Sequence, residues 1–219
     1  FISSICIKKQ YRGYGISKIL IDQSNKNLLK KNVLFSVVIA RKKLDYFYNK
    51  FNFWGVSTFP EIKLNSLKSK KKFQHGIIFK EVKNDDIEKI NSMYKFTYKK
   101  INGLVLRKKN DWKFIIKKCE NEKIKFLKVI FMKKLIGYVV LKKNQIFEIS
   151  CKTQLDYSNT IDALIKKFKF KTLLIFTNNK HSINDILLNY KHKLKYRIVH
   201  EGGHMVKILN IPTFKNIYK

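Results

Sequence analysis

Residues 5–20 have the sequence ICIKKQYRGYGISKIL, in which an apolar segment, a basic turn with two glycines and an amphipathic segment follow one another. The alternating apolar residues from Ile2 to Ile7 predict a β-strand. After the turn, apolar residues fall largely on one face of a predicted helix: Ile16, Ile19, Leu20, Ile21, Leu28 and Leu29. This layout can hold a phosphate group, because glycine lets the backbone approach the anion and the first helical turn offers unpaired N–H groups.

The turn differs from two well-known nucleotide-binding loops. It lacks the Gly-Lys-Ser/Thr of a Walker loop. Gly13-x-Gly15 also lacks the third glycine of the dinucleotide fingerprint, because Lys18 stands at that position. Arg12 adds a fork of donors suited to phosphate oxygens. The turn therefore predicts a phosphate site of another kind, and the alternative is a turn that needs glycine for its geometry alone.

Two segments resemble one known family. Residues 10–15, QYRGYG, resemble the Gln/Arg-x-x-Gly-x-Gly loop of the GCN5-related N-acetyltransferases (GNAT), which binds the pyrophosphate of acetyl-CoA. Residues 47–53, FYNKFNF, resemble the Phe-Tyr-x-Lys-x-Gly-Phe block of the same family, and between them 34–40 predicts a buried strand. Asn52 stands where the family has glycine, and asparagine tolerates the left-handed backbone. Arg41 stands about where many members have asparagine.

The resemblance implies acetyl-CoA as co-substrate and a set of residues that bind it. The positions that match the loop are Gln10, Arg12, Gly13, Tyr14, Gly15 and Ile16. The backbone N–H of Ile5 or Ile7 would polarise the thioester carbonyl. Tyr48 matches the tyrosine that donates a proton to the departing sulfur. The alternative interpretation of Tyr48 is an amphipathic core residue whose hydroxyl lies at the surface. No general base is identified, and no metal is expected.

The predicted domain organisation begins with 1–59, the C-terminal half of a GNAT domain that carries the pyrophosphate loop. A lysine-rich linker, 60–75, follows it. Residues 76–210 are predicted to form a second GNAT-like domain, and 211–219 a tail. Because the family has further elements before the loop, and the resemblance below implies a further domain after the tail, we expect a chain truncated at both ends.

The second domain repeats the order of the family but not its loop. From Gly76 onward the patterns predict a strand, two helices, a hairpin turning at Lys133-Lys134, and then alternating strands and helices. No glycine occurs from Lys152 to Thr160, so this copy is not expected to bind CoA through that loop. Such a pair, with the first copy active, resembles the enhanced-intracellular-survival (Eis) type; 102–107 and 204–210 resemble blocks of that type. The predicted fold class is α/β, with tandem GNAT folds and mixed sheets flanked by helices.

Composition sets wider limits. The 219 residues are 45% apolar and 14% aromatic, which favours a packed core over disorder. The three cysteines, Cys6, Cys119 and Cys151, are far apart and lack metal-ligand spacing, which favours a reduced, cytoplasmic setting. No apolar run approaches the roughly 18 residues of a membrane-spanning helix.

The net charge of +33 comes from 48 Lys and Arg against 15 Asp and Glu. Such an excess attracts nucleic acid or anionic membranes. Because lysine is spread over nearly every segment, a coding bias is favoured over a nucleic-acid surface. A cationic acceptor would need a local acidic pocket, for which Asp45, Glu148 and Glu201 are the candidates.

Two functions therefore stay open. The first is an enzyme, an N-acetyltransferase that moves the acetyl group of acetyl-CoA to a primary amine by direct attack. The amine belongs to a small molecule or a lysine, and self-association of the chain stays open. The alternative is a non-catalytic basic binding protein, for RNA or assembly, on a degenerate GNAT fold.

Overall fold

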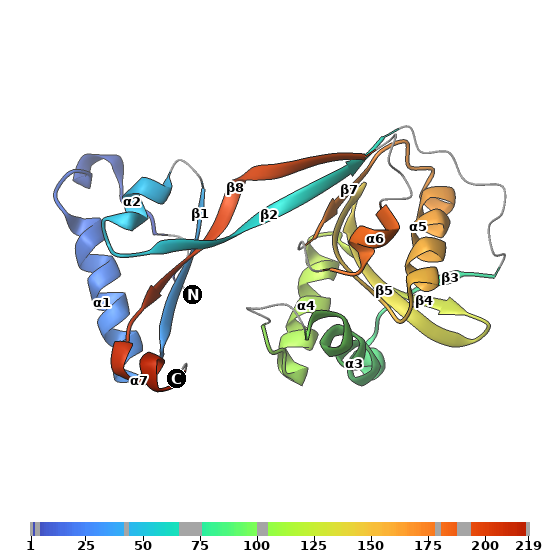
Figure 1. Ribbon diagram of the computed structural model, residues 1–219, viewed down its shortest axis with the longest axis horizontal. Helices are drawn as coiled ribbons and strands as arrows, with labels where there is room; N and C mark the ends of the chain where they lie inside the picture. Colours follow the sequence, from blue (N-terminus) through green and yellow to red (C-terminus); the bar gives the residue numbers. More distant parts are fainter. Residues whose placement is uncertain are drawn as a thin grey trace. The chain divides into compact units, whose positions relative to one another are not determined.

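The computed structural model describes residues 2, 5–41, 44–65, 76–99, 105–177, 181–187 and 194–217. The contacts between residues divide the chain into two compact units (Figure 1). Unit 1 comprises 1–59 with 198–219, and unit 2 comprises 60–197. Two long strands, β2 (Trp54–Leu64) and β8 (Leu194–Ile208), pass from one unit to the other.

Unit 1 contains parts of β2 and β8 together with one long helix, α1. Its elements besides the two strands are η1 (Lys9–Tyr11), α1 (Ile16–Lys30), β1 (Phe35–Arg41), α2 (Asp45–Asn49) and α7 (Ile211–Ile217). Strand β1 pairs with β8 in antiparallel register, with Val38 opposite Met205. The buried core consists of Ile21, Val38, Ala40, Phe53 and Met205. Alternate residues of β1 point inward, as the period of a strand requires.

The strand predicted over Ile2 to Ile7 is shorter in the structure. Ile2 forms a single parallel bridge with Val38, and its amide donates to the carbonyl of Val37 at 2.8 Å. Residues 5–8 have no strand assignment. Ile5 packs against the core by its side chain. The apolar alternation there reflects packing as much as strand pairing.

Unit 2 is a mixed sheet covered by helices. Its elements are β3 (Ile78–Glu81), η3 (Asn84–Asp86), α3 (Ile87–Tyr98), α4 (Lys109–Asn121), β4 (Lys125–Phe131), β5 (Lys134–Lys142), β6 (Gln145–Cys151), α5 (Gln154–Phe168), β7 (Leu173–Phe176) and α6 (Ile183–Leu187). The strand order is β2-β7-β6-β5-β4-β3. These pairs are antiparallel except for the parallel pair β6–β7.

Two core clusters lie on the two faces of this sheet. On β5, Tyr138 and Val140 contact the cluster formed with α3 and α4, whereas Val139 and Leu141 belong to the cluster formed with α5 and α6. Figure 1 shows these helix pairs on the two sides of the sheet. The strands of unit 2 are thus buried from both faces, which explains their dense apolar sequence.

The units and the predicted domains divide the chain at different points. The segment 60–64 of the predicted linker belongs to β2, while 66–75 lies outside the described residues. Residues 198–210, predicted within the second domain, group with unit 1, and most of the predicted tail forms α7. These differences arise because β2 and β8 are long strands whose partners a local sequence pattern cannot specify.

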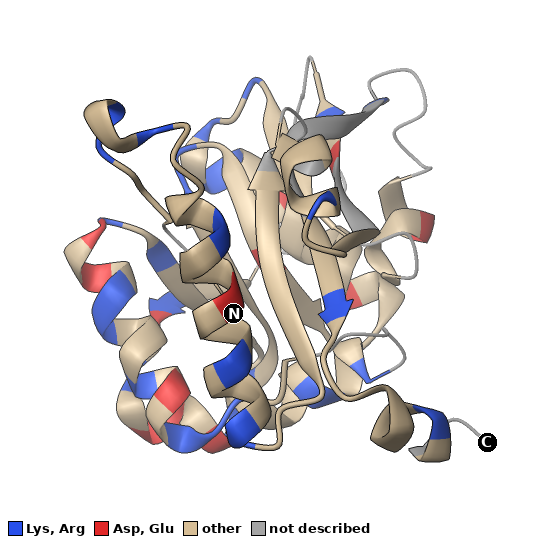
Figure 2. Ribbon diagram, turned by 90° about the vertical axis from the view of Figure 1, so that its left-hand side faces the viewer, with Lys and Arg blue, Asp and Glu red and all other residues tan. Residues whose placement is uncertain are grey.

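The positive charge is spread along the chain. Lysine and arginine lie on helices, strands and turns rather than on one element (Figure 2). Among the described residues, no helix combines the length and apolar character needed to cross a bilayer.

Candidate functional site

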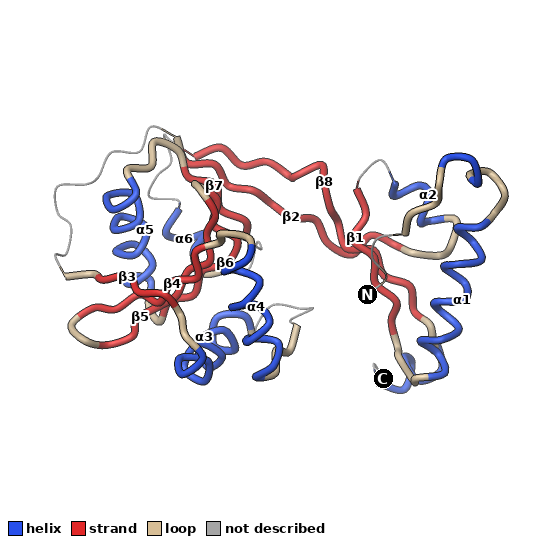
Figure 3. The backbone as a smooth tube through the Cα atoms, turned by 180° about the vertical axis from the view of Figure 1, so that it is seen from behind, coloured by secondary structure: helices blue, strands red, loops and turns tan. Residues whose placement is uncertain are grey.

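The glycine turn of unit 1 connects η1 to α1 (Figure 3). Gly13 has φ +90° and Gly15, the N-cap of α1, has φ +74°. Both values lie in the left-handed region, which favours glycine over residues with a Cβ. A Cβ built at either position would meet no atom within 4 Å. The turn therefore needs glycine for its backbone and also borders empty space.

The amides of this turn are available to a ligand. The N–H groups of Tyr11 and Arg12 donate to Lys8 and Lys9 at 2.9 and 3.2 Å. Those of Lys18 and Ile19 both donate to Gly15, at 2.9 and 3.3 Å. The amides between them, residues 13–17, donate to no acceptor within the described part of the chain.

The electrostatics of α1 favour an anion at the same place. Its first turn contains no acidic residue, and no side chain caps its N-terminus. The positive end of the helix dipole is therefore uncompensated by the chain. Free amides and an uncompensated dipole together make an anion-binding site.

Arg12 is held at the edge of the turn. Its Nε donates to the carbonyl of Ile7 at 3.1 Å, and the residue is exposed. Its two terminal guanidinium nitrogens have no partner among the described residues. Gln10 and Tyr14 are also exposed. These side chains border the turn without being engaged by the protein.

Tyr48 lies on α2, half-buried against the core of unit 1. Its ring packs edge-on with Phe47 and Phe53, at centroid distances of 5.1 and 6.0 Å. Burial raises the pKa of the phenol above its ordinary value. The hydroxyl has no hydrogen-bond partner within the described ranges. Tyr48 is thus a packed core residue that also keeps a transferable proton.

The helix end after Tyr48 has the predicted geometry. Asn52 has φ +61°, the left-handed conformation expected at the position where the related block has glycine. Its amide donates to Asn49 at 2.9 Å, and the amide of Phe53 donates to Tyr48 at 3.3 Å. This turn places Phe53 fully inside the core beside Tyr48.

Ile5 and Ile7 lie in the segment before the loop. Ile5 and Tyr48 pack against the same core cluster. Neither Ile5 nor Ile7 donates its amide to a described residue. The structure therefore brings the predicted residues of unit 1 together on the segment from Ile5 to Ile16 and on α2. Sequence reasoning missed Ser17, whose amide also donates to no described residue, as the rule that the first amides of a helix lack internal partners predicts.

The corresponding helix of unit 2 is closed to an anion. The amide of Asp156 donates to Oγ1 of Thr153, and the amide of Thr153 donates to Oδ2 of Asp156, both at 3.1 Å. This capping box puts a carboxylate at the N-terminus of α5. A phosphate would meet a negative charge and occupied amides there. The lack of glycine in this segment and the capping box thus both indicate that the N-terminus of α5 is not a phosphate site.

Of the three acidic candidates for an acceptor pocket, the structure describes the side chain of Glu148. Glu148 binds Arg107 through two hydrogen bonds of 2.8 and 2.6 Å and accepts a third from Tyr138 at 2.7 Å. Burial alone would lower the pKa of Arg107, but the hydrogen bond and charge of Glu148 raise it. Glu148 is therefore a structural partner. The side chains of Asp45 and Glu201 lie outside the described part of the structure.

No cluster of three or more His, Cys, Asp or Glu with metal-binding geometry occurs among the described residues. His181 is buried, and Nε2 and Nδ1 contact the carbonyl of Ile149 and the amide of Ile183, both at 3.1 Å. Both ring nitrogens thus have protein partners.

No protein-family model and no curated protein matches the sequence. Solved structures do resemble it. A GCN5-related N-acetyltransferase from Anabaena variabilis has a TM-score of 0.71 at 13% identity and covers 94% of this chain and 54% of its own. A probable N-acyltransferase from Enterococcus faecalis has a TM-score of 0.70 at 17% identity, over 96% of this chain and 54% of its own. Eis1 from Mycobacterium abscessus has a TM-score of 0.63 at 10% identity, over 95% and 56%.

This chain spans about half the length of these structures. At such low identity the likeness concerns the fold. It confirms the predicted fold class, a mixed α/β structure of the GNAT type.

Proposed function

From the acetyltransferase fold shared with these structures, we propose that the chain is an N-acetyltransferase which takes its acetyl group from acetyl-CoA. The pyrophosphate binds the turn of unit 1, through the amides of residues 13–17 and the guanidinium of Arg12. Gln10 and Tyr14 border the same site, and Ile16 contributes a first-turn amide. In this proposal the loop of unit 1 is the only CoA loop of the described chain, since Asp156 caps the corresponding helix of unit 2.

The observation that carries this proposal is the set of unpartnered amides at the N-terminus of α1. A turn that required glycine for geometry alone would be expected to satisfy these amides with its own side chains, as α5 does with Thr153 and Asp156. Instead, the turn has two left-handed glycines, its amides have no partner among the described residues, and a Cβ at either glycine would meet no atom within 4 Å. A diphosphate is the ligand that such a site fits best.

The reaction then proceeds by direct attack. The neutral amine attacks the thioester carbonyl, whose oxygen accepts a hydrogen bond from the backbone N–H of Ile5 or Ile7. A C–N bond forms, the C–S bond breaks, and the thiolate takes the proton of Tyr48. The attacking nitrogen releases its proton to solvent, which also reprotonates Tyr48. The raised pKa of Tyr48 keeps its proton in place at neutral pH.

Two units per chain and the likeness to Eis1 support an Eis-like tandem protein. The acceptor is a primary amine on a small molecule or a lysine. The three cysteines are free thiols, which supports a reducing, cytoplasmic compartment.

Calorimetry with acetyl-CoA tests this function. We expect Gly15→Glu to abolish the binding heat, because it places a carboxylate at the free amides. Gly55→Glu is the matched control, since it adds the same charge in unit 1 at a glycine that also borders empty space but is not left-handed. This control should bind acetyl-CoA within about twofold of wild type.

Two results would contradict the proposal. One is equal binding by wild type and Gly15→Glu. The other is no binding by wild type together with tight, salt-dependent RNA binding, which would favour the basic binding protein. Gly15→Ala separates backbone strain from charge, because it keeps the site neutral.

A further inference from the structure

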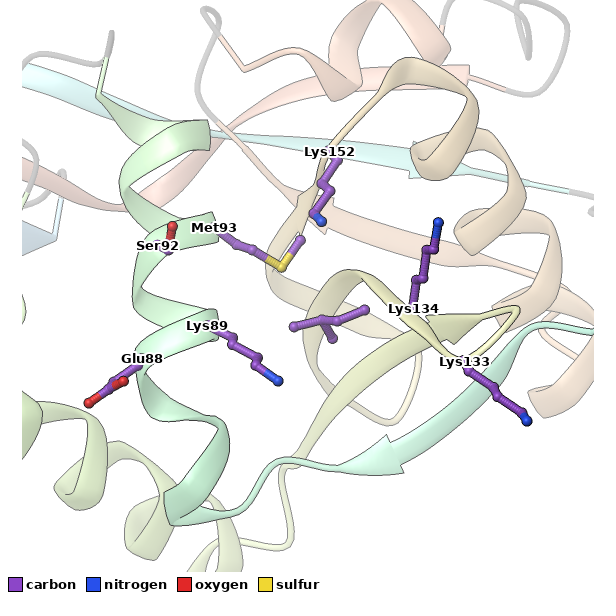
Figure 4. A pocket seen from close by; sticks show the side chains of 8 residues that line it. Glu88, Lys89, Ser92, Met93, Lys133, Lys134 and Lys152 are labelled. Carbon is purple, nitrogen blue, oxygen red and sulfur yellow. The ribbon is translucent and has the colours of Figure 1, made fainter.

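A second site lies in unit 2, on the side of α3 that faces the β4–β5 hairpin. The residues there surround a pocket of about 620 Å³, a size typical of small-ligand sites. Three of the lysines that line it come from separate elements: Lys89 on α3, Lys134 at the start of β5, and Lys152 just after β6. A fourth, Lys133 in the turn before β5, points away from them (Figure 4). Figure 4 shows Lys89 and Lys152 extending toward the space between these elements, while Lys134 extends upward from the β4–β5 hairpin.

The pocket combines this charge with an apolar floor. Met93 is 7% exposed and Leu135 is half-buried, and both line the pocket. The acidic residue in the lining, Glu88, points away from the lysines (Figure 4). Lys89, Lys134 and Lys152 are exposed, so a ligand in solution can reach their ammonium groups.

These lysines lack compensating acids. The ion pairs among the described residues are Arg107–Glu148, Lys118–Glu122 and Lys128–Asp86, and none includes the three lysines. The charge of Lys89 also acts on Asp86, but that carboxylate already binds Lys128 through both oxygens at 2.7 Å. The three like charges therefore repel one another across the pocket, and an anion would relieve that repulsion.

The backbone fixes the lysines at this place. The amide of Lys152 donates to Ile136 at 3.1 Å, which holds it at the end of the sheet. Lys134 pairs with Phe131 across the hairpin. Lys89 belongs to the helix that contributes Met93 to the buried core. Three rigid elements thus present three ammonium groups, each a compact donor suited to phosphate oxygens.

We propose that this pocket binds a polyphosphate, a chain of linked phosphate groups either free or as the tail of a nucleotide. The site differs from the glycine turn of unit 1, because ammonium groups rather than amides hold the anion. It also lies outside the N-terminus of α5, which its own capping box closes. The proposal does not depend on the acetyltransferase function.

Calorimetry with inorganic triphosphate and with ATP tests it, in the full chain carrying Gly15→Glu so that the loop of unit 1 is blocked. We expect Lys134→Gln with Lys152→Gln to weaken triphosphate binding at least tenfold. The matched control is Lys113→Gln with Lys117→Gln, which removes the same charge from exposed positions on α4. The control should change binding less than twofold.

The outcomes separate the sources of the ligand. Tighter binding of ATP than of triphosphate would assign a nucleotide, and equal binding would assign the phosphate chain itself. Lys134→Arg with Lys152→Arg keeps the charge and should retain binding, which shows that the loss in the glutamine variant is not unfolding. Equal weakening in pocket and control variants, or RNA binding with no response to triphosphate or ATP, would overturn the proposal.

Discussion

The ring of Tyr48 packs against the core of unit 1, whereas its hydroxyl has no hydrogen-bond partner among the described residues. If it protonates the leaving thiolate, Tyr48→Phe should lower kcat by about 10²–10⁴-fold. The dissociation constant of acetyl-CoA should stay within about twofold, because the ring packing is kept. Steady-state kinetics and calorimetry on one preparation measure both.

Tyr46→Phe is the control for that substitution, since Tyr46 is on the same helix and is 76% exposed. Because burial raises the pKa of Tyr48, the wild-type rate should not decline on its account below about pH 10. A Tyr48→Phe enzyme with unchanged kcat would leave Tyr48 as a core residue only.

His181 makes unit 2 sensitive to acid. Burial lowers its pKa from 6.5 to about 4, so the folded chain holds it neutral while the unfolded chain protonates it. The stability it contributes is complete above about pH 6.5 and is lost as the pH falls toward 4, by at most about 3 kcal/mol. Urea unfolding at pH 7.5 and pH 5 should show this loss in wild type.

His181→Asn should flatten that dependence, because an asparagine oxygen can still accept the amide of Ile183 but does not titrate. The same pH slope in variant and wild type would assign the acid sensitivity to other groups.

Single residues also show what a sequence can and cannot predict. The left-handed turn at Asn52 could be predicted, because a local backbone requirement selects the residue type. The partner of Glu148 could not, because Arg107 lies 41 residues away and reaches it only through the fold. The lysines of the pocket were missed for the same reason, since they come from three separate elements and resemble the many other lysines of the chain.

Among the elements, the pairing of β5 with β6 depends on one glycine. Gly137 lies opposite Cys151, and a Cβ there would come within 2.7 Å of both the sulfur of Cys151 and the carbonyl oxygen of Ser150. Gly137→Ala should therefore destabilise the protein by about 1–3 kcal/mol. Thermal and urea unfolding measure the change.

Gly55→Ala provides the comparison, because Gly55 is also in a strand but a Cβ there meets no atom within 4 Å. It should change stability by less than about 0.5 kcal/mol. Equal effects at both positions would mean that backbone freedom, and not the contact with Cys151, decides the cost.

Element types were predictable where periodicity was strong, and their ends were less so. The alternating strands and helices predicted after the hairpin carried no exact ends, although for α5, which begins at Gln154, the capping box of Thr153 and Asp156 was an available signal. The hairpin turns at Met132 and Lys133, both left-handed, one residue before the predicted turn. The start of β8 at Leu194 could not be predicted, because its pairing partners are distant in sequence.

For the molecule as a whole, the net charge of +33 sets the response to salt. Like charges repel more strongly in the compact state than in the unfolded chain, and added ions screen that repulsion. We therefore expect the Tm to rise by several degrees, on the order of 1 kcal/mol, between 0.05 and 0.5 M NaCl. Differential scanning calorimetry measures it, and a Tm that falls or stays constant would contradict the expectation.

At this scale the fold class was predictable, because the order of elements is written in the sequence. The limits of the units were not, because β2 and β8 carry contacts from one part of the chain to another. A local sequence pattern does not indicate that a strand spans two units.

The capping box of α5 has one more consequence. Helices α1 and α5 occupy corresponding places in their units. The positive N-terminus of α1 stays open to an anion, whereas Asp156 neutralises the N-terminus of α5. Asp156 therefore fills, in unit 2, the place that stays open at the N-terminus of α1. If the loop of unit 1 binds acetyl-CoA as proposed, a second such site in unit 2 would require both the replacement of Asp156 and the insertion of glycines, since neither change alone frees the amides for a diphosphate.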